Sequence, residues 1–154
     1  MPGVRRCSRN CWRHGRKTDV DEQGMLAAGC HCGAVRFRVP EVPQMQLLCF
    51  CSDCQLISGS QNYAPYIVPL TTVQLLQGQP VAYSVRSDQG RRNTRHFCGR
   101  CGARLWAELE IGLASVNGMC LDDRSHFTPD HNHRAHNAPA WCQIDSALAE
   151  LPSG

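Results

Sequence analysis

The stretch Cys49-Phe50-Cys51-Ser52-Asp53-Cys54 places three cysteines within six residues. Two further stretches carry cysteine pairs: Gly29-Cys30-His31-Cys32-Gly33 and Cys98-Gly99-Arg100-Cys101-Gly102. Cysteines one or two residues apart are badly placed to form disulfides with each other, but a metal ion can gather them. Seven thiolates divide into a closed four-ligand site and an open three-ligand site. The pattern therefore predicts two zinc ions per chain and a fold built around them.

The two cysteine pairs together predict the closed site. Cys30 and Cys32 lie two residues apart, so their side chains point to one face of an extended segment. Cys98 and Cys101 form a CxxC turn, in which backbone N–H groups can donate to the sulfurs and Gly102 can adopt a conformation that a side chain would disfavour. We predict that these four thiolates bind a structural zinc, whose binding energy contributes to folding. The alternative is four unrelated buried thiols.

The cluster of three cysteines predicts the open site. Cys49, Cys51 and Cys54 can bind one ion, and no fourth cysteine is close to them in the sequence. The fourth position could hold water, a substrate thiol, or a distant residue such as Cys120. Because catalytic zinc sites keep an open position, we predict that these three cysteines are metal ligands and form the catalytic centre. The alternative is a second structural zinc with a distant fourth ligand.

The length and composition indicate one soluble domain. A chain of 154 residues is long enough to bury a core. It has no apolar run near the roughly 18 residues that span a membrane, and its beginning lacks the apolar segment of a secretory signal. We therefore expect a cytoplasmic protein, whose cysteines stay reduced or bind metal. An oxidised secreted scaffold is the alternative.

The positive charge is concentrated at the N-terminus. The formal net charge is +3, yet the first eighteen residues carry six Arg and Lys and no acid, while the chain from Met25 onward has ten Arg and ten acidic residues. We expect a disordered basic extension at 1–24, with Met25 as an alternative start, and one domain at 25–154. A nucleic-acid-binding arm and a transit peptide are the alternatives. The neutral body indicates no nucleic-acid or membrane partner.

Short strands with little helix predict a mainly β domain. Apolar residues alternate with Arg in 34–39, and Ser52 is placed to cap a short helix that Gly59 ends. The segments 73–76 and 81–85 are predicted to pair as a hairpin. The other predicted strands are 46–49, 63–68, 93–97, 103–109 and 113–116.

Residues 121–140 are rich in Asp, Asn, His and Pro and are predicted to form a loop. Trp106 and Trp141 are predicted to be core residues, with Trp141 anchoring the end of the fold. The histidines of the loop are interpreted as solvated residues rather than as a supplementary metal or proton-transfer site. They are His131, His133 and His136.

Three ordered runs carry a family resemblance. They are Gly29-Cys-His-Cys-Gly-Ala-Val-Arg-Phe37, Cys49-Phe-Cys-Ser-Asp-Cys54 with Ser58-Gly-Ser60, and Phe97-Cys-Gly-Arg-Cys-Gly102. Leu121-Asp-Asp123, Phe127-Thr-Pro129 and Trp141 add a C-terminal signature. Over residues 26–152 the chain resembles the glutathione-dependent formaldehyde-activating enzyme family, also called the centromere protein V/GFA domain.

The resemblance implies a mainly β, Mss4-like (β-tent) fold of several coiled antiparallel sheets. It implies the same division into a structural and a catalytic zinc, and the joining of formaldehyde to the glutathione thiol to give S-hydroxymethylglutathione. The second family motif commonly reads Cys-His-Cys-x-x-Cys, and Phe50 stands in place of that histidine here. We expect Phe50 to remove any proton-handling role of the histidine and to make the site drier.

We therefore predict a zinc-dependent carbon–sulfur lyase-type enzyme that resembles S-(hydroxymethyl)glutathione synthase and uses a small thiol such as glutathione. Arg95, Arg100 and Arg104 are expected either to meet carboxylates of a peptide-like thiol or to offset the charge of a four-thiolate zinc. One alternative is a non-catalytic, zinc-stabilised binding module of Mss4-like fold. Another is a zinc-ribbon-like nucleic-acid binder that uses the basic tail.

Overall fold

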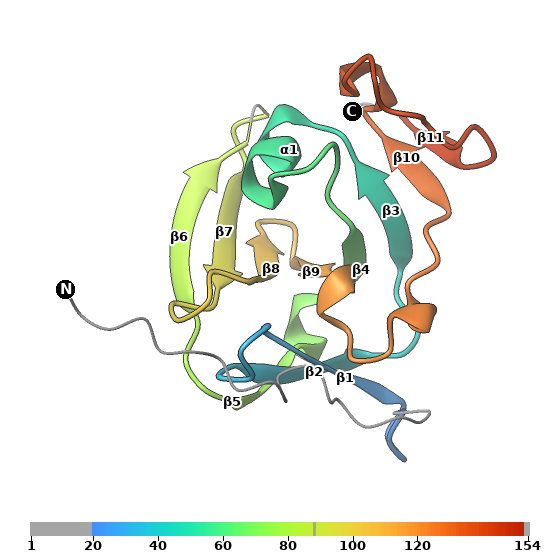
Figure 1. Ribbon diagram of the computed structural model, residues 1–154. Coiled ribbons are helices and arrows are strands. Elements are labelled where there is room, and N and C mark those ends of the chain that lie inside the picture. Colours follow the sequence, from blue (N-terminus) through green and yellow to red (C-terminus); the bar gives the residue numbers. More distant parts are fainter. Residues whose placement is uncertain (1–19, 88, 153–154) are drawn as a thin grey trace.

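The computed structural model describes residues 20–87 and 89–152, so residues 1–19 of the predicted extension lie outside the described residues. The fold is mainly β, as predicted, and is consistent with the Mss4-like arrangement (Figure 1). The described strands are β1 (Met25–Gly29), β2 (Arg36–Pro40), β3 (Met45–Cys49), β4 (Pro65–Pro69), β5 (Gln74–Gln77), β6 (Val81–Arg86), β7 (Arg92–Phe97), β8 (Arg104–Leu109), β9 (Leu113–Asn117), β10 (His131–His133) and β11 (Ala149–Leu151). The described helices are α1 (Ser52–Ser58) and the 3₁₀ turns η1 (Leu70–Thr72), η2 (Gly118–Cys120), η3 (Arg124–His126) and η4 (Ala135–Asn137).

The strands form two sheets. A small sheet has the order β1-β2-β5, and a large mixed sheet has the order β11-β10-β3-β4-β9-β8-β7-β6. In Figure 1 the large sheet curls from β6 on the left to β3 on the right, with α1 at the top of the view and the small sheet at the bottom. No helix in the described ranges is long and apolar enough to cross a membrane.

One face of the large sheet forms the core with the small sheet. Tyr66, Val116 and Trp106 are direct partners across β4, β9 and β8, and all three are buried. Phe37 of β2 packs on this row, with its ring centroid 5.1 Å from that of Trp106. Trp106 is therefore a core residue, as predicted.

The other face of the large sheet is turned away from this core. Because successive side chains of a strand point to opposite faces, the neighbouring residues Ile67, Ser115 and Ala107 lie on the second face. A register shift at β7–β8, where His96 pairs with Trp106 and Phe97 with Arg104, marks a β-bulge. Bulges re-aim side chains, and this one brings Arg104 to the same cavity as Ala107.

The predicted hairpin was wrong. The segments 73–76 and 81–85 do lie in strands, but β5 pairs with β2 in the small sheet and β6 pairs with β7 in the large one. The reason is the turn between them. Gly78 has a φ of +79°, and a Cβ on it would lie 2.1 Å from the Ala34 carbonyl oxygen. The tight approach at Gly78 therefore directs the chain from one sheet to the other.

The predicted loop at 121–140 was wrong in its middle, because β10 pairs in parallel with both β3 and β11. Its buried residue is polar: Asn132 is 3% exposed, and its Nδ2 donates to the Asp145 carbonyl at 2.9 Å. A three-residue strand whose buried side chain is polar shows no hydrophobic alternation in the sequence. Trp141 is 73% exposed, so the prediction that it anchors the fold was also wrong.

The described residues before β1 contact the domain. Val20 forms an isolated antiparallel bridge with Leu26. The Asp21 carboxylate accepts the backbone N–H of Met25 at 3.0 Å and pairs with Arg38 at 2.8 Å. These contacts fix the start of the first strand.

We predict that deleting residues 1–19 leaves thermal unfolding unchanged, because that segment has no hydrophobic periodicity. Deleting residues 1–24 should lower the melting temperature by about 4 °C, since losing the Asp21 contacts costs about 1 kcal/mol. Calorimetry of the full chain, both truncations and Asp21→Ala would measure this. Equal melting temperatures for the two truncations would show that the Asp21 contacts contribute nothing.

Candidate metal centres and cavity

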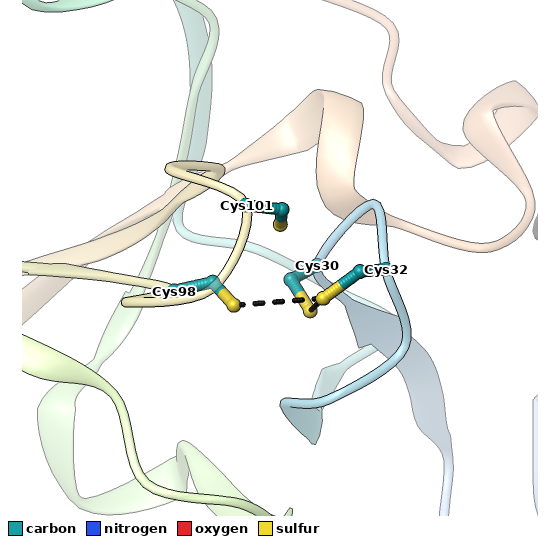
Figure 2. Close-up of side chains that lie close together, drawn as sticks. All are labelled: Cys30, Cys32, Cys98 and Cys101. Atoms are coloured by element: carbon teal, nitrogen blue, oxygen red, sulfur yellow. Dashed lines mark hydrogen bonds between the residues drawn. The ribbon is translucent and has the colours of Figure 1, made fainter. Parts of the chain in front are cut away.

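Four cysteine sulfurs meet where the β1–β2 loop approaches the β7–β8 turn (Figure 2). Cys30 and Cys32 come from the loop, Cys98 and Cys101 come from the turn, and their Sγ atoms all lie within 4.8 Å of one another. The Cys30–Cys32 and Cys32–Cys98 sulfur separations are 3.6 and 3.8 Å, and the cysteines are free thiols. The structure thus brings together the four residues predicted as one ligand set.

This four-cysteine cluster fits zinc. Four sulfurs at about 2.3 Å from a tetrahedral zinc are separated by about 3.8 Å, which matches the observed spacing. Burial acts to raise the pKa of Cys101, but the backbone N–H groups of Ala103 and Cys32 lower that pKa to about 7. Such donors stabilise the thiolate form that a metal requires. Four protein sulfurs leave no position for a substrate.

The second group of sulfurs lies where β3 leads into α1. Cys49 ends the strand, Cys51 caps the helix and Cys54 lies in its first turn, and the three Sγ atoms lie within 4.8 Å of one another. The helix cap was predicted at Ser52, but it is Cys51, whose Sγ accepts the N–H of Cys54 at 3.4 Å. Gly59 ends the helix as predicted, with a φ of 64°.

The three sulfurs of this three-cysteine cluster influence each other's protonation. The contacts with Cys49 and Cys54 lower the pKa of Cys51. The contact with Cys51 raises the pKa of Cys49, and the contacts with Cys49 and Cys51 raise the pKa of Cys54. The positive charge of Arg134 also lowers the pKa of Cys51. A divalent cation would favour the thiolate form of all three sulfurs, so the donor set fits zinc with a position left for another ligand.

These three cysteines line a cavity of about 450 Å³ on the face of the large sheet turned away from the core, here called the three-cysteine cavity. Its lining holds five arginines and two carboxylates, which gives an excess of positive charge that favours an anionic ligand. The arginines are Arg91, Arg92, Arg95, Arg104 and Arg134, and the carboxylates are Asp53 and Glu110.

A larger cavity of about 680 Å³ lies beside the four-cysteine cluster and is lined by Cys30. Tyr63 and Arg104 line both cavities, so the two adjoin. A metal ion held by the four-cysteine cluster would have no open ligand position, whereas one held by the three-cysteine cluster would keep one.

Arg95 ties α1 to the large sheet. It is 5% exposed, and its guanidinium donates to Asp53 Oδ2 at 2.6 Å and to Tyr83 Oη at 3.1 Å. Burial acts to lower the pKa of Arg95, but the hydrogen bonds to Tyr83 and Asp53 raise it above its usual value. The charged side chain therefore holds the helix that carries Cys54 against the sheet.

Two lining residues come from the segment that the sequence indicated as a solvated loop. In the β3–β10 pairing His133 lies opposite Cys49, and both His133 and Arg134 line the cavity. Arg134 is the one non-glycine residue with a positive φ, 57°, in the described ranges. Left-handed backbone costs a non-glycine residue about 1 kcal/mol or more and is concentrated at functional sites. Nothing in the sequence signals this conformation.

The structure also bears on the expectations for Phe50 and for the arginines near the third cysteine stretch. Phe50 is 1% exposed, because the middle residue of Cys49-Phe50-Cys51 points away from the two sulfurs. It lines neither of the two cavities, so the expectation that it makes the site drier was wrong. Of the arginines near the third stretch, Arg95 and Arg104 line the three-cysteine cavity, whereas Arg100 is exposed and lies outside its lining.

The fold and the two clusters define a mainly β protein with one group of four and one group of three cysteines, each of which could hold a metal ion. Its sequence matches the family described as glutathione-dependent formaldehyde-activating enzyme over residues 25–137. It is also 32% identical over 133 residues to a Halomonas elongata protein named "Putative glutathione-dependent formaldehyde-activating enzyme", covering 79% of this chain and 82% of that protein. The chain therefore belongs to the glutathione-dependent formaldehyde-activating enzyme family, as its motifs predicted.

We predict that removing Asp53 costs more stability than removing Arg95. Asp53→Ala leaves a buried guanidinium with only Tyr83, for a loss of about 2–3 kcal/mol, while Arg95→Met replaces that charge with an apolar chain for about 1 kcal/mol. Urea unfolding of both variants and of the double variant would measure the difference. If Arg95→Met were the more destabilising change, the main role of Asp53 would not be to compensate the buried charge of Arg95.

Proposed function

We propose that this protein joins formaldehyde to the thiol of glutathione, giving S-hydroxymethylglutathione, and that the reaction takes place in the three-cysteine cavity. Family membership supports the choice of reaction. The observation that supports the location is the convergence of three sulfurs, without a fourth in that group among the described residues, in a cavity with excess arginine. Glutathione is an anionic thiol, so both features suit it.

The reaction is an addition. The glutathione sulfur bonds to the carbonyl carbon, the π bond of the carbonyl opens, and the oxygen takes up the proton that the thiol loses. The reverse breaks the carbon–sulfur bond, which places the protein among carbon–sulfur lyase-type enzymes. A zinc ion held by Cys49, Cys51 and Cys54 would supply the positive charge that favours the thiolate form of the substrate.

The arginines are proposed to hold the carboxylates of glutathione. Arg91 and Arg92 lie at the β6–β7 turn, and Arg134 lies across the cavity just before η4. Guanidinium groups form paired, charge-assisted hydrogen bonds with carboxylates, which fixes a ligand in orientation as well as in place. Arg95 already pairs with Asp53, so we assign it a positioning role.

The four-cysteine cluster is proposed to hold a second, structural zinc that links the two sheets. We propose one domain at 25–154 and a reducing, cytoplasmic location, in which both sets of cysteines remain available to metal.

We predict two zinc ions per chain of unequal lability. A chelator should first remove the ion at Cys49, Cys51 and Cys54 with the fold retained, because only that site has an open position. Cys98→Ser should prevent soluble folding, since structural zinc contributes about 10 kcal/mol or more in small domains, whereas Cys54→Ser should fold with less metal. Metal analysis with circular dichroism measures both. One zinc per chain, or loss of both ions together with unfolding, would contradict the division.

We predict that glutathione changes the visible spectrum of the cobalt-substituted protein, and that the zinc protein accelerates S-hydroxymethylglutathione formation measured by exchange NMR. Cys51→Ser should lose both signals because it removes a metal ligand. Cys142→Ser, outside both clusters, is the matched control and should keep them. A protein that holds two zinc ions but gives neither signal would favour the non-catalytic binding module.

A further inference from the structure

The floor of the three-cysteine cavity changes character across the large sheet. One cross-strand row runs over four strands in direct register, from Ile67 through Ser115 and Ala107 to Arg95, and all four residues line the cavity. The row is apolar on β4 and cationic on β7. The two central residues of the row, Ser115 and Ala107, have small side chains, which leave room for a ligand above them.

The apolar half of the floor extends beyond this row. Leu47 of β3 and Pro65 of β4 line it on one side, and Leu109 and Ile111 line it at the β8–β9 turn. Ile111 is 58% exposed in the protein alone. A ligand that covers such surface gains about 25 cal/mol per Å² of apolar area removed from water. Pockets that combine apolar walls with a few charged groups typically bind ligands that have both characters.

The cationic half lies on the side of β7 and the β6–β7 turn, where Arg91 and Arg92 line the cavity beside Arg95, which pairs with Asp53. It suits the two carboxylates of glutathione. S-Hydroxymethylglutathione has no apolar group that matches the opposite half, because formaldehyde contributes a single hydroxylated carbon. The apolar half of the cavity therefore has no counterpart in the formaldehyde adduct, and it could accept a larger one.

We propose that this protein also accepts aldehydes that carry an alkyl or aryl group, which lies on the apolar half of the three-cysteine cavity while the glutathione carboxylates meet the arginines. This inference rests on the proposed function and names its substrate class. The reaction balances as before: sulfur adds to the carbonyl carbon of R–CHO, the oxygen takes the thiol proton, and the product is the hemithioacetal R–CH(OH)–SG. No oxidant or reductant is needed.

Stable thioethers test this arrangement without turnover. Titration calorimetry on the zinc-loaded protein would compare S-methyl-, S-butyl- and S-hexylglutathione. Each methylene that is buried should tighten binding about fourfold, so the S-hexyl compound should bind at least tenfold more tightly than the S-methyl compound. Affinities equal within threefold would overturn the proposal and leave the formaldehyde reaction standing, and binding of none of the three compounds would count against both.

Variants test whether the preference for the S-hexyl compound arises at the apolar half of the three-cysteine cavity. Ala107→Leu fills the space above the row and should reduce the S-hexyl to S-methyl preference to below threefold. Ile111→Ser, in an exposed turn, should also reduce the preference and remains informative if Ala107→Leu does not fold. Leu76→Ser on β5, 53% exposed and outside the cavity lining, is the matched control and should keep the full preference. A preference that survives both cavity variants would place the alkyl chain elsewhere and overturn the proposal.

Discussion

The convergence of four sulfurs from two turns is the constraint on which the rest of the structure depends. Cys32 and Cys98 are 66 residues apart in the chain and 3.8 Å apart at their sulfurs. Four thiolates this close repel one another strongly unless a cation lies among them. The sulfurs bring the loop of the small sheet against the β7–β8 turn of the large one, and Cys30 and Cys98 belong to the same buried core as Phe37 and Trp106.

Because side chains alternate along each strand, the residues that form the core on one face of the large sheet determine which residues lie on the other face. Tyr66, Val116 and Trp106 are buried against the small sheet, and their chain neighbours Ile67, Ser115 and Ala107 line the cavity. The same strands therefore form the core on one face and the floor of the cavity on the other. Loops then add chemistry at the rim: the β3–α1 junction brings three sulfurs, and the β6–β7 turn brings arginines.

The sequence predicted what is encoded locally. The spacing of Cys30 with Cys32 and of Cys98 with Cys101 predicted their gathering, and hydrophobic alternation located most strands of both sheets. Strand partners were less predictable, because the close approach of Gly78 to another part of the chain decides that β5 and β6 separate. Short elements with polar interiors such as β10 carry no periodic signal. The arginine-lined cavity depends on these non-local pairings and could not be predicted.

Phe50 departs from the common family motif, and the pairing of β10 with β3 brings a histidine and an arginine to the cavity from elsewhere in the chain. Phe50 lies between two cysteines whose sulfurs face the cavity, so its side chain is directed into the protein and is 1% exposed. A histidine at this position would point the same way and would need a buried polar partner. The histidine and the arginine beside the three sulfurs come instead from His133 and Arg134, more than 80 residues further along the chain. Arg134 has a left-handed backbone, and its positive charge lowers the pKa of Cys51, an effect that the uncharged side chain of Phe50 could not have.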